Sequence, residues 1–267
     1  MHPMLNIAVR AARNAGKIIA NSFEEQDKIE TEQKGGNDFV TNIDREAEFA
    51  IINTIRKSYP DHCIIGEESG EHKGENPDYV WIVDPLDGTT NFIKGIPHFC
   101  VSIALRVKGK LDQAVIYDPM RAELFTASRG AGAQLNDYRI RCSKAKDIDV
   151  TVLATGFPHK CKHHLDAYLG MFKDFFIEAS DIRRSGSAAL DLAYVAAGRV
   201  DGFWEIGLKP WDTAAGQLMV KEAGGLITDF VGGPNQDKSG NIIAGNSKVT
   251  RAMVKTIRPH LTEALAK

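Results

Sequence analysis

The stretch that decides the fold lies between residues 79 and 91 and reads Tyr79-Val80-Trp81-Ile82-Val83-Asp84-Pro85-Leu86-Asp87-Gly88-Thr89-Thr90-Asn91. Its first five residues are apolar or aromatic, as in a buried strand, and they lead directly to the carboxyl group of Asp84. Pro85 cannot continue the hydrogen bonding of a strand, so we expect the chain to turn there. Gly88 permits an unusual backbone angle, and a helix that begins at Thr89 would point its free amides at a bound anion. The stretch therefore predicts a strand, a turn and a helix around a polar site.

The residues before this stretch predict two amphipathic helices. The first should end near Asn21, and the second opens with a capping box of Thr41 and Asp44 and stops around Pro60. The polar residues 24–37 between them predict a mobile loop. A short apolar run at 63–65 ends at Glu67, just as the run before Asp84 ends at a carboxylate.

The residues after it change character near position 150. Consecutive short strands suited to one antiparallel sheet are expected at 101–107, 111–117, 123–127 and 138–141. Strands and helices then alternate, with strands at 151–154 and 200–204 and helices at 188–197, 211–223 and 248–265. This order predicts two sheet-and-helix halves packed as layers in one compact unit. We place the first half at 1–145, with most of the metal ligands, and the second at 146–267, which completes the metal and substrate sites.

The composition narrows the class of protein. The chain has 267 residues, 43% of them hydrophobic, which is ample for a core. Lys and Arg (33) nearly balance Asp and Glu (35), no basic tail or RNA-binding motif is present, and a general polyanion-binding surface is not expected. The four cysteines form no closely spaced framework and suggest reduced thiols. Without a secretion signal or an apolar run of membrane length, we expect a cytoplasmic protein with no membrane contact.

Acidic residues from three separate segments suggest a metal site. Glu67, Asp84 and Asp87 are hard oxygen donors, and Asp212 lies in the first turn of the helix that follows Pro210. Such donors favour Mg²⁺, with Mn²⁺ as a substitute, over Zn²⁺. Taken alone, an aspartate in a first turn is usually a cap, and Asp84 alone could be a turn residue. Their combination at strand–turn–helix junctions favours the metal interpretation.

A second group of potential ligands is a weaker candidate. His159, Cys161, His163 and His164 are too close in sequence to close a tetrahedron around zinc readily, and Lys160 and Lys162 add positive charge among them. We do not expect a zinc site there.

Three motifs carry a resemblance to a known family. Glu67-Glu68-Ser69, the stretch from Asp84 to Phe92, and Trp211-Asp212 followed by Glu222-Ala223-Gly224-Gly225 resemble the inositol monophosphatase family, over nearly the whole chain and closest to its enterobacterial branch. The resemblance implies a mixed α and β fold, the five-layer αβαβα sandwich of the superfamily that also contains fructose-1,6-bisphosphatase. It also implies a homodimer that is sensitive to lithium.

The resemblance assigns a role to individual residues. Two or three Mg²⁺ ions would be bound by Glu67, Asp84, the carbonyl of Leu86, Asp87 and Asp212. Glu67 and Thr89 would orient the attacking water, with Asp44 hydrogen-bonded behind Thr89. Gly88 and Thr89 would bind the phosphate, Glu205 would contact the hydroxyls of the alcohol, and Asp87 and Asp212 would lie beside the substrate. Independently of the resemblance, Gly186, Ser187 and Ala188 open a helix whose amides and small side chains suit a polyol substrate, although the segment could equally be a plain helix N-cap.

The function expected from these assignments is hydrolysis of a small phosphate monoester, inositol 1-phosphate, by direct attack of a metal-activated water. Three alternatives stay open: a sugar bisphosphate or a 3′-phosphonucleotide as substrate, and a role mainly in protein interaction. The same branch of the family is associated with antitermination during ribosomal RNA transcription, with Nus factors and RNA polymerase as partners. That role rests on the resemblance alone.

Overall fold

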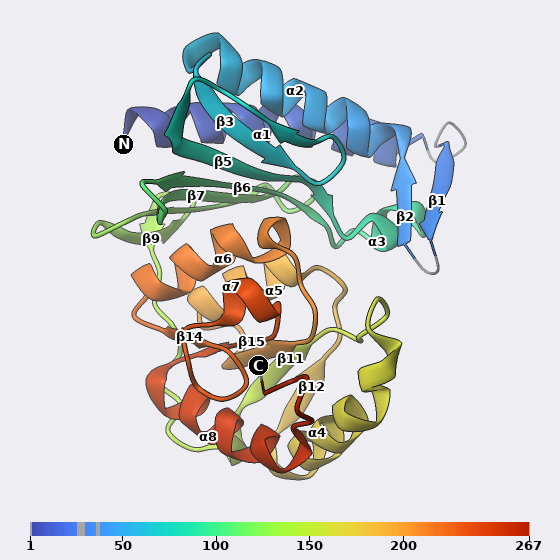
Figure 1. Ribbon diagram of the computed structural model, residues 1–267, viewed down its shortest axis with the longest axis vertical. Helices are drawn as coiled ribbons and strands as arrows, with labels where there is room; N and C mark the ends of the chain where they lie inside the picture. Colours follow the sequence, from blue (N-terminus) through green and yellow to red (C-terminus); the bar gives the residue numbers. More distant parts are fainter. Residues whose placement is uncertain (1, 26–29, 36–37, 267) are drawn as a thin grey trace.

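The computed structural model describes residues 2–25, 30–35 and 38–266. Figure 1 shows five layers stacked along the long axis of the molecule: a helix pair, a large sheet, a second helix pair, a smaller sheet and an outer helix pair. The predicted αβαβα sandwich is therefore confirmed. The large sheet is built from residues up to 139 and the smaller one from residues after 151.

The first layer consists of α1 (Pro3–Phe23) and α2 (Asn42–Ser58). The predicted capping box is present, because the Thr41 hydroxyl accepts from the amide of Asp44 while the Asp44 carboxylate accepts from the amide of Thr41. Part of the expected loop is instead a hairpin of β1 (Thr31–Gly35) and β2 (Asp38–Thr41). The prediction failed there because a polar strand lacks the apolar alternation that identifies strands. Residues 26–29 and 36–37 of that prediction lie outside the described residues.

The second layer is an eight-stranded sheet in the order β10-β9-β8-β7-β6-β5-β3-β4. Its strands are β3 (His62–Gly66), β4 (Gly70–His72), β5 (Asn76–Asp87), β6 (Cys100–Val107), β7 (Lys110–Asp118), β8 (Glu123–Ser128), β9 (Gly132–Leu135) and β10 (Tyr138–Arg139). Neighbours are antiparallel except β3 and β5, which run parallel. The carboxyl ends of these two strands therefore lie at the same edge of the sheet.

The sequence led us to expect a turn at Pro85, but the strand β5 continues past this residue. Asp84 pairs with Ser102 and Asp87 pairs with Cys100, so Pro85 and Leu86 together oppose a single residue of β6. This two-against-one pairing is a β-bulge, which lets proline sit within a strand because the ladder is interrupted there. The short helix α3 (Thr89–Ile93) follows directly, as predicted.

The third and fourth layers belong to the second half. The helices α5 (Ala188–Ala196) and α6 (Pro210–Glu222) lie between the sheets and agree with the prediction. The smaller sheet has the order β12-β11-β13-β15-β14, with β11 (Val152–Thr155), β12 (Asp181–Arg183), β13 (Gly202–Glu205), β14 (Leu226–Thr228) and β15 (Ile242–Gly245). The sequence indicated β11 and β13, whereas β12, β14 and β15 were not predicted.

The outer layer consists of α4 (Leu165–Glu178) and α8 (Ser247–Ile257). We did not predict α4, whose apolar residues occupy several faces and give no single stripe. The predicted last helix is too long, because α8 ends before Pro259 in a 3₁₀ turn, η4 (Arg258–His260). The remaining elements are α7 (Gln236–Ser239), η2 (Ile148–Val150) and η3 (Lys162–His164).

Apolar side chains fill the spaces between all five layers. One cluster lies between the first helix pair and the large sheet, one reaches from the large sheet through α5 and α6 to the smaller sheet, and one lies under α4 and α8. Among the described residues, no helix is long and apolar enough to cross a bilayer. The extended middle cluster holds the two halves together, and the candidate site opens between them.

Candidate active site

One cavity of about 820 Å³ contains all the predicted site residues except Asp44. The first half contributes Glu67, Asp84 and Leu86 to Thr89, and the second half contributes Gly186, Ser187, Ala188, Glu205 and Asp212. Segments more than a hundred residues apart in the sequence thus converge on one space. Its volume is within the usual range for a small-molecule site.

The edge of the large sheet positions the first two carboxylates. Glu67 follows β3, and its amide donates to the carbonyl of Val83 on the parallel neighbour β5 (3.1 Å). Asp84 lies one residue further along β5, where its carboxylate accepts from the amide of Leu86 (3.0 Å). Behind Glu67, the buried Glu48 of α2 accepts from the amides of Glu68 and Ser69 (3.0 and 2.9 Å). The turn that carries Glu67 is therefore held from the helix layer.

The bulge in β5 delivers Asp87 to the second half of the molecule. Its carboxylate accepts from the hydroxyl of Ser187 (2.6 Å) and from the amide of Ala189 (2.7 Å), at the start of α5. A negative charge is favourable there because the amides of a first helical turn lack intrahelical partners. The hydroxyl of Ser187, which we expected to contact the substrate, is thus engaged by Asp87 in this structure and also caps α5 by accepting from the amide of Leu190.

A second contact between the halves lies beside it. The side-chain amide of Asn91 donates to the carbonyl of His98 (2.8 Å) and to that of Ser185 (2.9 Å). Gly186 next to Ser185 has a φ of +94° and no room for a side chain, because an added Cβ would lie 2.9 Å from Asn91 Nδ2. Small residues at this point let the two halves approach each other closely.

Asp212 reaches the cavity from the start of α6. Its carboxylate accepts from the amide of Lys209 (2.7 Å), so the cap that we considered as an alternative is present. The same side chain also lines the cavity with Asp87 and Glu205. Capping and a position in the cavity are therefore compatible, because a carboxylate has lone pairs for several partners.

Thr89 connects Asp44 to the cavity. The Thr89 hydroxyl is 3.0 Å from the carboxylate of Asp44 and 3.0 Å from the carbonyl of Leu86, and it can donate to either. Asp44 is buried behind it and is held by Thr41. Burial raises the pKa of Asp44, while its hydrogen bonds with Thr41 and Thr89 act in the opposite direction. The Thr89 oxygen is thus oriented by the protein and lines the cavity.

The carboxylates of the cavity destabilise one another's charged forms. Burial raises the pKa of Asp84 well above its usual range, and the charges of Glu67, Asp87 and Asp212 raise it further. Burial also raises the pKa of Asp87 to about 6, although Ser187 and Ala189 oppose this shift. Burial and the charge of Asp87 raise the pKa of Asp212 to about 7. Such a concentration of negative charge is stable at neutral pH only with bound cations or retained protons.

The donor set fits a hard divalent cation. It consists of carboxylate oxygens and the backbone carbonyl of Leu86, without sulfur. Within residues 2–25, 30–35 and 38–266, no three acidic, histidine or cysteine side chains converge closely enough to hold an ion as they stand. The hydrogen bonds to Leu86, Ser187, Ala189 and Lys209 explain this, since each turns a carboxylate oxygen toward a protein donor.

The cavity also contains residues that sequence reasoning missed. Asp191 of α5 is buried, and its pKa is raised well above the usual range by burial and by the charge of Asp87. A single acid within the apolar run 188–196 was the available signal. Gly156 makes room for Glu205, whose carboxylate occupies the place of a Cβ at that position. Phe157, His159, Lys160, Lys162, Arg184 and Lys209 also line the cavity.

Comparison with known proteins identifies relatives over the full length of the chain. The sequence model of the inositol monophosphatase family matches residues 1–263. The Nus factor SuhB of Escherichia coli (strain K12) is 63% identical over 265 residues, 99% of each chain, in agreement with the expected closeness to the enterobacterial branch. The crystal structure of the extragenic suppressor protein suhB from Bartonella henselae superposes with a TM-score of 0.95 at 46% identity, covering 97% of this chain and all of the other. Inositol monophosphatase from Anabaena (Nostoc) sp. PCC 7120 gives a TM-score of 0.86 at 37% identity, covering 96% and 95%.

Proposed function

Because the chain belongs to the inositol monophosphatase family, which implies a phosphatase, we propose that it hydrolyses inositol 1-phosphate with the help of Mg²⁺. The observation that carries the proposal is the convergence of Glu67, Asp84, Asp87 and Asp212 on one cavity, where their charges oppose one another. A purely structural cluster would avoid this repulsion, since like charges at close range are costly. A bound divalent cation would neutralise it.

The proposed ligands of Mg²⁺, or of Mn²⁺ in its place, are Glu67, Asp84, the carbonyl of Leu86, Asp87 and Asp212. When bound, the cations neutralise the charge on the phosphoryl group and lower the pKa of a water molecule toward neutrality. The protein's own groups position the reactants. Thr89 donates its proton toward Asp44 or Leu86, so its lone pairs can accept from a water that attacks the phosphorus.

In this proposal, the first half of the chain binds the phosphate and the second half binds the alcohol. The amides of Gly88 and Thr89, at the start of α3, would donate to the phosphate oxygens. Gly88 has a φ of +104°, and an added Cβ would meet the carbonyl of His98 at 3.0 Å, so glycine is required there. Glu205, with the turn at Gly186, Ser187 and Ala188, would contact the hydroxyls of the alcohol.

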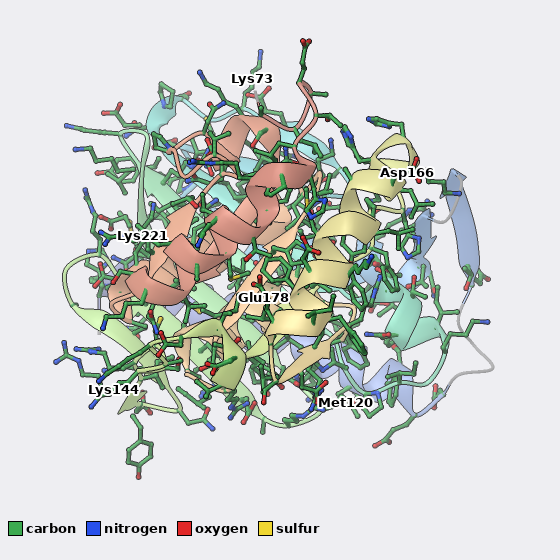
Figure 2. All side chains as sticks on the ribbon, turned by 90° about the horizontal axis from the view of Figure 1, so that it is seen from below. Lys73, Met120, Lys144, Asp166, Glu178 and Lys221 are labelled. Carbon is green, nitrogen blue, oxygen red and sulfur yellow. The ribbon has the colours of Figure 1, made fainter. Side chains whose placement is uncertain are left out.

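The test is phosphate release from inositol 1-phosphate with and without Mg²⁺, in the wild type and in Asp87→Asn. The amide keeps the shape of the side chain and removes its charge, so we expect turnover to require Mg²⁺ and to fall by about a hundredfold or more in the variant. Asp166→Asn, on the exposed start of α4 (Figure 2), is the matched control and should be unaffected. Wild-type turnover in Asp87→Asn would contradict the assignment. A sugar bisphosphate or a nucleotide monoester that is hydrolysed much faster would replace inositol 1-phosphate as the substrate.

A second candidate function is that of a Nus-type factor in antitermination of ribosomal RNA transcription. The observation that favours it is the name of the 63% identical relative, a Nus factor, which aligns with almost the whole chain. The two roles are compatible, since the cavity leaves the outer surface available to a protein partner. We expect the tagged protein to capture Nus factors and RNA polymerase from a lysate. Their absence, where the Escherichia coli relative captures them in parallel, would exclude the role.

A further inference from the structure

One strand of the large sheet carries small polar side chains where its neighbour carries carboxylates. In β6, Cys100 lies opposite Asp87 and Ser102 lies opposite Asp84. Residues that face each other across an antiparallel pair point to the same side of the sheet, and this side meets α5 and α6 (Figure 1). The next residue of β6 on that side, Ala104, is apolar and belongs to the middle cluster. The two polar side chains of β6 therefore coincide with the edge of the candidate site.

Both polar side chains contact the start of a helix of the second half. The sulfur of Cys100 is 3.7 Å from the hydroxyl of Ser187, the residue before α5. The hydroxyl of Ser102 donates to the carbonyl of Trp211 at 3.3 Å, in the first turn of α6. Because Trp211 directly precedes Asp212, the second contact joins the large sheet to the helical turn that presents Asp212 to the cavity.

Ser102 lies behind the cavity and not in its wall. Its exposed fraction is 1%, and the cavity is lined by other residues. A buried hydroxyl needs a hydrogen-bond partner, because its burial without one is costly. The carbonyl of Trp211 has two lone pairs, so it can accept from Ser102 and from an amide of its own helix. Without the hydroxyl that carbonyl would keep its helical partner, so the fold should tolerate the loss of Ser102.

A second contact of β6 with the helix layer lies further from the carboxylates. Gln217, in the middle of α6, donates to Asp237 of α7 (2.6 Å), and Asp237 accepts from the half-buried Arg106 of β6 (2.9 Å). Arg106 is four residues beyond Ser102, which is roughly 13 Å along a strand. The two contacts therefore join the same layers at different distances from the site, and Arg106 provides a matched control for a purely structural role.

We propose that Ser102 is a positioning residue for Asp212. Its hydrogen bond to Trp211 fixes the start of α6 against the strand pair that carries Asp84, and so fixes the place of the Asp212 carboxylate relative to the other acids. The inference rests on the proposed function, in which these carboxylates hold Mg²⁺. Position matters there because Mg²⁺ demands nearly ideal octahedral geometry, and groups that orient its ligands contribute to its affinity.

The test measures Mg²⁺ binding and turnover in the full chain with Ser102→Ala. We expect a rise of about tenfold both in the Kd of Mg²⁺, measured by calorimetric titration without substrate, and in the Mg²⁺ concentration for half-maximal phosphate release. The kcat at saturating Mg²⁺ should stay within about twofold of the wild type, because every ligand remains. Ser102→Thr retains the hydroxyl and should retain most of the affinity. Arg106→Gln should lower the Tm and leave the Kd of Mg²⁺ unchanged.

A double-mutant cycle shows whether Ser102 acts through Asp212. In Asp212→Asn the affinity for Mg²⁺ is already reduced, and the addition of Ser102→Ala should then change it by less than about twofold. A full tenfold loss in that background would show that Ser102 acts through another group, and would overturn the assignment.

A measurement without metal makes the test independent of the phosphatase. Of the three tryptophans, Trp81 and Trp204 are fully buried, whereas Trp211 is partly exposed. Acrylamide quenching of the fluorescence therefore reports mainly on the start of α6. With a chelator present, we expect the quenching constant to rise about twofold in Ser102→Ala, and to stay unchanged in Ser102→Thr and in Arg106→Gln.

The outcomes distinguish the two hypotheses. Wild-type affinity for Mg²⁺ in Ser102→Ala would refute the positioning role while leaving the phosphatase intact. A wild type that neither binds Mg²⁺ nor releases phosphate would refute the proposed function, and the quenching would then decide on Ser102 alone. Unchanged quenching in Ser102→Ala refutes the positioning of α6, whereas a rise that Ser102→Thr does not share supports it.

Discussion

Buried carboxylates occur in two kinds of surroundings in this protein. Asp229 accepts from the amides of Val231, Gly233 and Asn235 at 2.7–3.3 Å, so its charge is met by three neutral donors in its own loop. In the cavity, Asp84 accepts from a single amide and shares a hydrogen bond with the acidic side chain of Glu67, while Asp87 and Asp212 add further negative charge nearby. Both side chains are largely shielded from water, with exposed fractions of 6% and 1%.

The difference between the two teaches what burial of an acid means. Asp229 organises a loop and needs nothing from outside, because hydrogen bonds to a carboxylate offset the loss of hydration. Asp84 lacks that compensation within the protein, so its surroundings suit a ligand of opposite charge. Burial of an acid alone therefore identifies no function, whereas burial of an acid beside other acids indicates a site for a ligand of opposite charge.

Removal of one charge from the cavity should have the largest effect. In Asp84→Asn we expect phosphatase activity to fall by about a hundredfold or more, because a cation loses a ligand. The metal-free protein should at the same time become more stable, by about 1 kcal/mol, since repulsion is relieved and the acceptor for Leu86 remains. Phosphate release and urea unfolding with a chelator measure the two quantities. A variant that is both active and less stable would contradict the comparison.

Removal of the loop carboxylate should have the opposite pattern. In Asp229→Ala three partly buried amides lose their acceptor, so we expect the free energy of unfolding to fall by about 1–2 kcal/mol while turnover per folded molecule is retained. Urea unfolding and active-site titration measure these effects. Asp229→Asn keeps one acceptor oxygen and should lose less. A strong loss of turnover in folded Asp229→Ala would place this residue in the wrong group.

The pH dependence of stability should also differ between the two groups. The pKa values of Asp87 and Asp212, about 6 and about 7, are above the ordinary value of 3.8. A carboxyl with a raised pKa in the folded state favours folding while protonated, and this stability is lost as pH rises from the ordinary value of 3.8 to the raised values of about 6 and about 7. The Tm of chelated protein should therefore fall by roughly 4 °C, or about 1–2 kcal/mol, between pH 5 and pH 8.

Two controls accompany that measurement. Excess Mg²⁺ should abolish the decline, because the cation replaces the protons. The double variant Asp87→Asn with Asp212→Asn should flatten it without metal. A Tm of the chelated wild type that rises over the same interval would show that these carboxyls do not govern the stability.

The smallest effect is expected from a substitution of Glu48, which lies behind the cavity. Glu48 holds the amides of Glu68 and Ser69, beside Glu67. In Glu48→Ala the turn is released, and we expect about a fivefold higher Mg²⁺ concentration for half-maximal activity, with little change at saturation. Glu46→Ala, exposed on the same helix, is the matched control. An unchanged Mg²⁺ requirement would mean that Glu48 supports the fold only.

Local sequence patterns were sufficient for several elements. The capping box at Thr41 and Asp44, the hairpin of β6 and β7, and the helices α5 and α6 were predicted because each depends on neighbours within a few residues. The helix α4 and the short strands β12, β14 and β15 were missed. Their positions depend on packing between distant layers, which leaves a weak local pattern.

The carboxylates themselves were identified from the sequence, because an apolar strand that ends in an acid is visible locally at Glu67 and Asp84. Their mutual arrangement was decided only in three dimensions. The bulge at Pro85 and Leu86 turns Asp87 toward Ser187, a hundred residues away, and the approach of α6 adds Asp212. The sequence states which residues carry charge, but the burial of the carboxylates and the repulsion between them depend on distances. Those distances arise when two sheets and the helices between them bury a common apolar core.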